Sequence, residues 1–170
     1  IKKKFFKEFS EGKIKLKLNN FIDIKNSEKF DIIIGLGFIE YFDEYEIIFD
    51  KISLLLNDNG QIILSFQSNS SFDFFMVKLL YIPRLIVSFI TGRKTKTPPR
   101  KCWSPNSAKR IFKKYNFKSI KIINYNTNLL VYPFTRFFPK LSNFTGKVFD
   151  QTFLSKINFF SSGFIISAKK

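Results

Sequence analysis

Residues that could bind a ligand follow three apolar runs of the sequence, at the points where the runs end. The clusters are residues 19–21, 36–38 and 65–67. If the runs are parallel strands, their carboxyl ends meet at one edge of a sheet, where ligands of open α/β domains bind. The second cluster contains Gly37, whose missing side chain would let a ligand approach the backbone closely. The three clusters therefore predict a single ligand-binding crevice.

Composition excludes several other kinds of catalytic centre. The chain has no histidine and one cysteine, Cys102. A zinc site of His and Cys ligands, a catalytic histidine and a disulfide framework are therefore ruled out, and we predict no metal site. With 170 residues and 45% hydrophobic content, the chain can form one domain with a core. The predicted location is the reducing cytoplasm, with attachment to the membrane periphery as a second option.

The elements that must position the clusters are clearest in residues 29–66. The isoleucines at 32–34 form an apolar run, which predicts a central strand buried on both faces. From Asp43 the apolar period becomes helical, with acidic residues in the first turn. Residues 57–60 predict the end of that helix in a Gly turn, and residues 61–66 a second strand. This order predicts a right-handed crossover between parallel strands.

Three stretches in this order resemble the second half of a class I S-adenosylmethionine-dependent methyltransferase. They are FDIIIGLGFIEYF at 30–42, LLNDNGQIILS at 55–65 and CWSPNSAKRIFKKYNFKSIKI at 102–122. The chain departs from the family where Tyr41 stands in place of a frequent histidine. The resemblance implies an α/β fold with a partial Rossmann-like sheet of parallel strands and crossover helices. Its last strand, at 163–168, would be antiparallel and inserted between its two predecessors.

The resemblance also implies S-adenosylmethionine as cofactor. Asn20 matches the position that contacts the adenine amine, and Phe21 could lie against the adenine ring. Leu36 and Gly37 would face the methionine part. The Gly-rich turn and the acidic ribose-binding residue of such domains are absent, so we expect residues 1–170 to be a single, N-terminally incomplete domain, a fragment. A plain turn at Asn20 and a strand terminator at Gly37 remain the alternatives.

By the same resemblance, the reaction is methyl transfer to a small or lipid-like acceptor. Phe38, Ser65, Gln67 and Trp103 are the predicted substrate contacts, and Tyr41 is the predicted proton acceptor. Methyl transfer from a sulfonium depends on alignment more than on acid or base, so the missing histidine is no objection. Packing of the lid for Trp103, and of a helix start for Tyr41, are the alternatives.

Two segments are predicted to be lid-like insertions, at residues 68–102 and 127–160. The first reads as two short helices kinked at Pro83, too charged and interrupted to cross a membrane. The second predicts a helix around residues 148–160. Between the two lids, Ser104 before a proline predicts the start of another helix.

The net charge of +16 comes from one part of the chain. No acidic residue lies between Asp73 and Asp150, an interval that contains 16 lysines and arginines. Compositional bias toward lysine and phenylalanine is one explanation. The other is a non-catalytic basic and aromatic module that binds anionic membranes, with Arg136 and Lys140 reaching the head groups. Nucleic acid ranks below membranes as a partner, because the sequence lacks an aromatic-basic RNA-binding motif.

Overall fold

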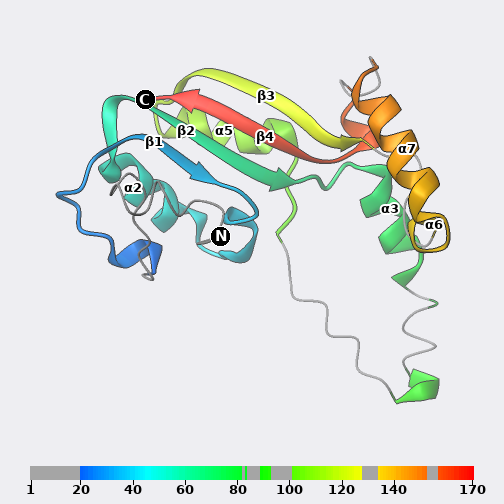
Figure 1. Ribbon diagram of the computed structural model, residues 1–170. Coiled ribbons are helices and arrows are strands. Elements are labelled where there is room, and N and C mark those ends of the chain that lie inside the picture. The colour runs from blue at the N-terminus through cyan, green and yellow to red at the C-terminus, as the bar shows by residue number, and fades with distance from the viewer. Residues whose placement is uncertain (1–19, 82, 84–88, 93–100, 128–133, 153–156) are drawn as a thin grey trace, which may run out of the picture.

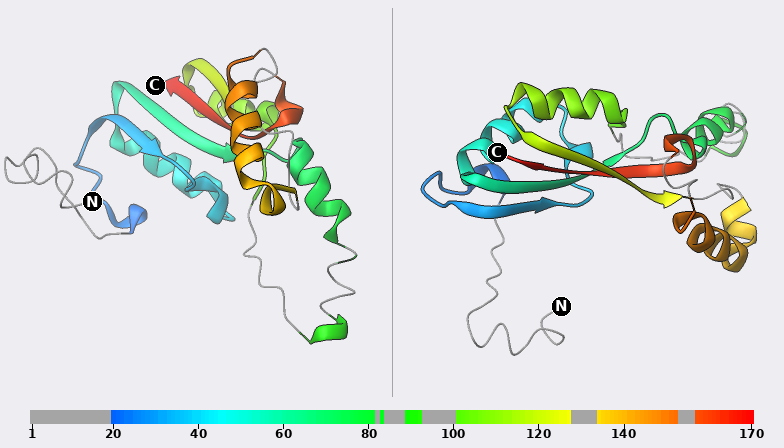
Figure 2. Two further views of the ribbon diagram at one scale, coloured as in Figure 1. Left: turned by 45° about the vertical axis from the view of Figure 1, so that its right-hand side comes forward. Right: turned by 90° about the horizontal axis from the view of Figure 1, so that it is seen from above.

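The computed structural model describes residues 20–81, 83, 89–92, 101–127, 134–152 and 157–170 (Figure 1). These residues form a four-stranded sheet with helices on one face and at one end (Figures 1 and 2). The strands are β1 (Phe30–Gly35), β2 (Leu56–Gln67), β3 (Lys118–Thr127) and β4 (Ser161–Lys169). The helices are α2 (Tyr45–Leu55), α3 (Phe72–Leu79), α5 (Pro105–Lys114), α6 (Phe134–Phe137) and α7 (Pro139–Asp150). Short 3-10 helices are η1 (Phe21–Asp23), η2 (Ile39–Tyr41) and η4 (Asn158–Phe160).

The strand order of the sheet is β1-β2-β4-β3. β1 and β2 are parallel and joined through α2, with Ile33 opposite Ile62. β4 is antiparallel to both of its neighbours, β2 and β3. The predicted mixed sheet, with an antiparallel last strand between its two predecessors, is therefore confirmed. The first of the three apolar runs, the one before residues 19–21, is residues 14–18. It lies outside the described residues, so the strand predicted from it stays a prediction.

The core lies between the sheet and the two helices α2 and α5. Alternate residues of a strand point to the same face, so one face of β2 and β4 supplies the apolar side chains that these helices cover. The opposite face carries exposed isoleucines on β1 and β3 at positions 32, 34 and 123. The largest fully buried side chains are Phe49, Phe66, Phe112, Phe164, Ile39, Ile48, Ile52, Leu55, Leu56, Ile62, Leu64 and Ile166.

β1 is an edge strand, so the prediction of a strand buried on both faces is wrong. In the part of the chain that the structure describes, β1 pairs with β2 alone. Ile32 and Ile34 are consequently exposed, whereas Ile33 on the other face packs against the core. An apolar run of this kind needs a neighbouring strand and a covering layer on its outer side, and these described residues supply neither.

The connection from α2 to β2 also differs from the prediction. α2 ends at Leu55 and β2 begins at Leu56, so residues 57–60 belong to the strand and not to a Gly turn. The register between β1 and β2 shifts between the pairs Phe30–Leu56 and Ile32–Gln61. Residues 57–60 therefore form an irregular stretch of the β1–β2 ladder.

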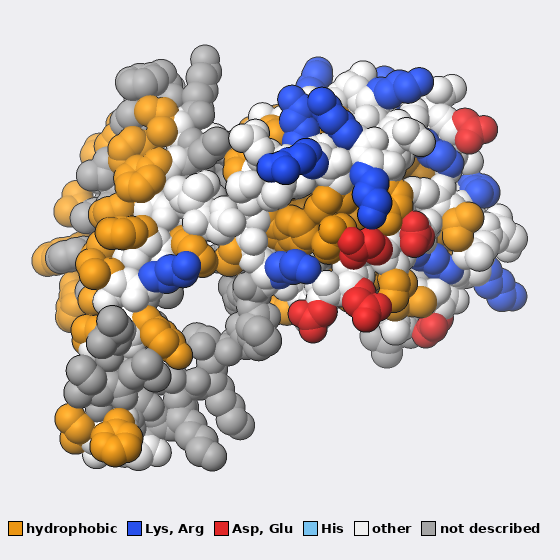
Figure 3. Space-filling view, turned by 180° about the vertical axis from the view of Figure 1, so that it is seen from behind, with side chains coloured by type: hydrophobic (Ala, Val, Ile, Leu, Met, Phe, Trp, Pro, Cys, Tyr) orange, Lys and Arg blue, Asp and Glu red, His pale blue; other side chains and the backbone are white. Residues whose placement is uncertain are grey.

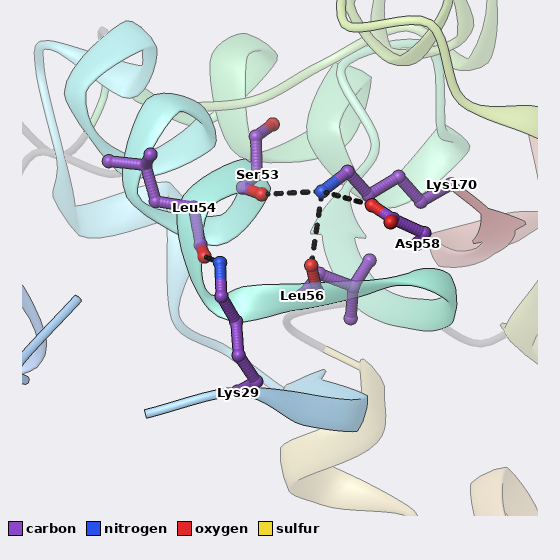
Figure 4. Close-up of polar contacts among 6 residues, drawn as sticks. All are labelled: Lys29, Ser53, Leu54, Leu56, Asp58 and Lys170. Carbon is purple, nitrogen blue, oxygen red and sulfur yellow. Dashed lines mark hydrogen bonds and ion pairs between the residues drawn. The ribbon is translucent and has the colours of Figure 1, made fainter. Parts of the chain in front are cut away.

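Lysines distant in sequence cap the carboxyl end of α2 (Figure 4). The Nζ of Lys170 donates hydrogen bonds to the carbonyl oxygens of Ser53, at 3.0 Å, and Leu56, at 3.1 Å. It also lies 3.7 Å from Oδ1 of Asp58. The Nζ of Lys29 donates to the carbonyl oxygen of Leu54. The last carbonyl groups of a helix lack partners within it, and a cation there is favoured by the helix dipole.

Replacing Lys170 by methionine is expected to lower the free energy of unfolding by about 0.3–1 kcal/mol, the usual effect of a cation at a helix carboxyl end. Urea denaturation at low salt measures the change. Lys169→Met is the matched control, because Lys169 is exposed at the end of β4. Equal losses in the two variants would contradict the capping role of Lys170.

Serine caps begin two of the helices, and the cap at Ser104 is the predicted one. Ser71 Oγ accepts a hydrogen bond from the Phe74 N–H at 3.1 Å at the start of α3. Ser104 caps α5 with a reciprocal pair of bonds to Ser107, a capping box, and proline takes the first helical position. Both helices therefore begin where local side chains satisfy the first N–H groups.

The position of the helix in the second predicted lid was wrong. α7 spans Pro139–Asp150, so it begins and ends earlier than the predicted helix at 148–160. Pro139 does not interrupt a helix here, because it is at the helix start, where proline is tolerated. The residues around Pro83 lie largely outside the described part, so the predicted kink there stays a prediction, as does the division of the chain into a domain and two lids. No helix in the described ranges has the length and apolar character needed to cross a membrane.

Candidate functional site

A pocket lies at the carboxyl end of β1, beside the edge of the sheet. Its volume is about 240 Å³. β1, β2 and β3 all run toward the end of the molecule at which α3, α6 and α7 lie (Figures 1 and 2). The side chains around the pocket are all apolar, so it suits a flat apolar group. The lining residues are Phe21, Ile33, Ile34, Gly35, Leu36, Phe38, Ile52 and Leu64.

Two phenylalanines form an aromatic wall of this pocket. The rings of Phe21 and Phe38 meet edge to face with their centroids 5.4 Å apart. Phe38 also contacts Phe42, at 4.7 Å between centroids. Phe21 begins η1 and Phe38 precedes η2, so two loops distant in sequence supply the wall. The structure thus brings together Phe21, Leu36 and Phe38, three of the predicted site residues.

The turn after β1 is tied to the end of β2 by a hydrogen bond. Gly37 has a φ of +61°, a conformation that favours glycine. Its N–H donates to Oγ of Ser65 at 2.7 Å. Ser65 is buried, so its hydroxyl oxygen satisfies a backbone donor at the point where the two strands end. Gly37 and Ser65 are therefore neighbours, as predicted for one crevice, while their contacts with cofactor and substrate stay predictions.

Asn20 serves locally as the cap of η1. Its Oδ1 accepts a hydrogen bond from the Ile22 N–H at 3.4 Å, and the residue is exposed. This geometry agrees with the alternative of a plain turn. A contact between Asn20 and an adenine amine stays a prediction.

Gln67 and Trp103 meet at the end of β2, away from the pocket. The backbone N–H of Trp103 donates a hydrogen bond to the Gln67 carbonyl oxygen at 2.8 Å. The Trp103 side chain is 6% exposed and packs edge to face on Tyr45 and Phe66. Packing of the chain after the first predicted lid accounts for the position of the indole ring, but its buried Nε1–H has no hydrogen-bond partner in the described part of the chain. Substrate contacts by Trp103 and Gln67 stay predictions.

Tyr41, the predicted proton acceptor, ends η2 and is 53% exposed. It is not among the residues that line the pocket. Its catalytic role stays a prediction.

Tyr125 lies at the crevice although the sequence patterns did not single it out. It sits near the carboxyl end of β3, opposite Gly163 of β4. A Cβ built on Gly163 would lie 2.5 Å from both Cζ and Oη of Tyr125, so the phenol ring lies across this glycine toward β2. Its hydroxyl reaches Ser65, which already accepts the Gly37 N–H.

The surroundings of Tyr125 keep its phenol protonated at neutral pH. Burial raises the pKa of Tyr125, and the negative charge of Glu40 raises it further. The hydrogen bond with Ser65 acts in the opposite direction but is the smaller effect. The phenol can therefore donate a hydrogen bond, and the negative charge of Glu40 acts on it electrostatically. Tyr125 and Glu40 do not line the pocket. Tyr125 is close to Ser65, and a Cβ built on Gly37 would lie 3.8 Å from Oε1 of Glu40, so both groups are near the turn after β1, which is hydrogen-bonded to the end of β2.

The sequence contained a signal for the position of Tyr125, but that signal could be used only once the pairing of β3 with β4 was known. A glycine inside an otherwise apolar strand marks a close approach by another group. Gly163 is such a glycine, and its cross-strand neighbour is Tyr125. Glu40 could have been found beside Tyr41, since both belong to the same short turn of η2.

Comparisons with known proteins were made with both the sequence and the structure. No family model matches the sequence, and no curated protein matches it. A SAM-dependent methyltransferase from Archaeoglobus fulgidus superimposes with a TM-score of 0.55 at 18% identity, over 96% of this chain and 71% of that one. A SAM-dependent methyltransferase from Thermotoga maritima gives 0.53 at 12% identity, over 89% and 61%. A protein from Bordetella parapertussis gives 0.59 at 11% identity, over 99% and 48%.

The chain thus spans only part of the length of these structures, and at such low identity the likeness concerns the fold. It extends over nearly all of this chain. It agrees with the antiparallel β4 inserted between β2 and β3. The chain therefore has the fold of the class I S-adenosylmethionine-dependent methyltransferases.

Proposed function

We propose that this chain belongs to an S-adenosylmethionine-dependent methyltransferase and contributes to methyl transfer to a small or lipid-like acceptor. The observation that carries the proposal is the apolar pocket at the carboxyl end of β1, in a sheet of the methyltransferase fold. Ligands of open α/β sheets bind at this edge. The acceptor class rests on the apolar surroundings of the crevice and on the sequence resemblance.

The pocket residues fit the adenosyl part of the cofactor. Phe21 and Phe38 offer ring faces and edges to a flat heterocycle. The backbone at Leu36 and Gly37 is open to close approach by the methionine part. When bound, S-adenosylmethionine supplies an electrophilic methyl group on a sulfonium. The sequence lacks the Gly-rich turn and the acidic ribose partner, so we expect this chain by itself to bind the cofactor weakly.

Tyr125 and Glu40 are the groups that we assign to the acceptor. The protonated phenol of Tyr125 donates a hydrogen bond to the acceptor oxygen or nitrogen and holds it in place. The Glu40 carboxylate accepts the proton that the acceptor gives up. Rate enhancement in such a site comes mainly from alignment of donor and acceptor. Tyr41 remains a second candidate for the proton acceptor.

Nuclear magnetic resonance with S-adenosylhomocysteine, the demethylated cofactor, tests the proposed site in this chain. We expect roughly millimolar binding, about −4 kcal/mol, with resonance changes concentrated at Phe21, Leu36, Gly37 and Phe38. Phe38→Ala should abolish these changes, because it removes one side of the aromatic wall. Phe144→Ala, an exposed phenylalanine on α7, is the control and should leave them intact. Changes confined to other residues, or none at all, would contradict the proposal.

A further inference from the structure

Helix α7 turns its apolar side chains away from the protein. Leu141, Phe144 and Val148 recur at helical spacing and are exposed, Phe144 to 66%. The side that faces the protein carries Ser142, which is 4% exposed. Thr145 is partly buried, and its hydroxyl bonds to backbone carbonyl oxygens of its own helix at 3.0 Å. A surface helix of a water-exposed protein shows the opposite arrangement.

Neighbouring elements extend this apolar surface. Phe137, the last residue of α6, and Phe138, which precedes α7, are also exposed. On α3, Phe75 and Leu79 are one turn apart and both exposed. We call these side chains, with those of the α7 stripe, the apolar end. Figure 3 shows hydrophobic side chains gathered at the end of the molecule formed by α3, α6 and α7. Large exposed apolar patches mark surfaces that meet a partner.

Lysines outnumber acidic residues on the helices of the apolar end, which contain Asp73 in the first turn of α3 and Asp150 as the last residue of α7. Lys140 and Lys147 are seven residues apart on α7, so they share one side of the helix beside the stripe, and both are exposed. Lys78 on α3 is exposed and lies over the Phe74 ring at 4.7 Å. The sequence contains no carboxylate between Asp73 and Asp150. Long lysine side chains can leave their stems on apolar surface while the ammonium groups stay in water.

From these observations we infer that the apolar end docks on the surface of a membrane that contains anionic lipids. The exposed Phe and Leu side chains of α3, α6 and α7 enter the boundary between head groups and acyl chains. Lys78, Lys140 and Lys147 bind the anionic head groups around them. Docking of this kind holds the helices in the plane of the interface and requires no spanning helix.

The positive charge of the chain favours an anionic membrane over a second copy of the chain as the partner of the apolar end. A second copy of the chain would bring like charges together, since each copy carries a net charge of +16 and exposes Lys78, Lys140 and Lys147 beside the patch. The surface of an anionic membrane is negatively charged, apolar beneath its head groups, and deformable. It therefore matches both the lysines and the exposed apolar side chains of the patch. The inference does not depend on methyl transfer. Vesicle binding needs no cofactor and can therefore succeed or fail separately from the function proposed above.

Flotation of the full chain with vesicles tests the apolar contacts. We expect binding to vesicles of phosphatidylcholine and phosphatidylglycerol in equal parts, and much weaker binding to phosphatidylcholine alone. Leu141→Ser should weaken binding to the mixed vesicles about tenfold, the usual effect of losing one inserted leucine. Leu54→Ser is the matched control, because Leu54 is a helical leucine on α2 with 49% exposure against 51% for Leu141. It should leave binding unchanged.

Substitution of the lysines tests the head-group contacts without touching apolar packing. Lys140→Gln and Lys147→Gln should each weaken binding to the mixed vesicles about fivefold and leave the weak binding to phosphatidylcholine unaltered. Circular dichroism confirms that each variant is folded. Absence of wild-type binding to the mixed vesicles, or equal losses for the Leu141 and Leu54 variants, would overturn the inference. So would a wild-type dimer that Leu141→Ser converts to a monomer, since the patch would then join two copies.

Discussion

Replacing Phe66 by alanine is expected to lower the free energy of unfolding by about 3–5 kcal/mol, the usual loss for a buried phenylalanine. The Phe66 ring is fully buried at the centre of the aromatic core. It stacks on Phe164 at 5.3 Å with an interplanar angle of 9°. It also contacts Trp103 and Phe112, at 6.0 and 6.1 Å between centroids. One truncation thus removes contacts to β4, to α5 and to the segment before α5.

The cavity left by Phe66→Ala should remain open, because the surrounding rings belong to separate elements and cannot all move inward together. Urea denaturation followed by far-ultraviolet circular dichroism measures the loss. Phe144→Ala removes the same atoms from an exposed position on α7 and should change stability by less than about 0.5 kcal/mol in the absence of membranes. Similar losses at the two positions would show that the aromatic core is not where the stability lies.

Local patterns predicted the crossover between parallel strands and the start of α5 correctly. The alternation between an apolar run and a helical period in residues 30–66 depends on short-range geometry, which the sequence expresses directly. The serine caps of α3 and α5 are likewise satisfied within three residues. The strand order was predictable from the family resemblance, since no local pattern distinguishes an inserted antiparallel strand from the next parallel one.

Other features depended on partners that are remote in sequence. Residues 57–60 have the composition of a turn, yet they form strand. The carbonyl groups at the end of α2 are capped by Lys170 and Lys29, so a local Gly cap is not needed. α7 was misplaced for a different reason. The apolar stripe of a helix normally identifies the side that packs on the sheet, but in α7 this stripe faces solvent. The sequence pattern therefore did not show how α7 packs.

The residues of the candidate site also fall into two groups, those that local sequence predicted and those that depend on partners remote in sequence. Leu36 and Phe38 were predictable, because both follow the carboxyl end of β1, where the pocket lies. Phe21 was predicted at the same edge of the sheet and lines the same pocket. Tyr125 was not predictable, since its place in the crevice depends on the bare backbone of Gly163 in another strand. Trp103 is far from the end of β2 in sequence but lies beside it in space, and its side chain is buried in the core. Its predicted substrate contact stays a prediction.

Gly163→Ala tests how the sheet holds Tyr125 in the crevice, and we expect it to lower the free energy of unfolding by about 2–3 kcal/mol, toward the upper end for overpacking. The new Cβ would lie 2.5 Å from the Tyr125 ring and 2.8 Å from the Phe66 carbonyl oxygen. The ring can rotate away, but the carbonyl oxygen belongs to the paired β2 backbone. Gly35→Ala is the control, because its nearest contact is a movable methyl group of Leu64 at 2.8 Å, so it should cost less.

A double-mutant cycle separates the two contacts of the added Cβ. In a Tyr125→Ala background, the cost of Gly163→Ala should fall by about 1 kcal/mol, because only the clash with the backbone remains. In the single variant Gly163→Ala, the phenol displaced from its place beside Ser65 becomes more hydrated. Burial is the main cause of the raised pKa of Tyr125, so that pKa should move back toward its ordinary value, as ultraviolet titration can measure. An unchanged pKa together with an unchanged stability would mean that the ring does not lie across Gly163, and Tyr125 would then lose its place as the group that orients the acceptor.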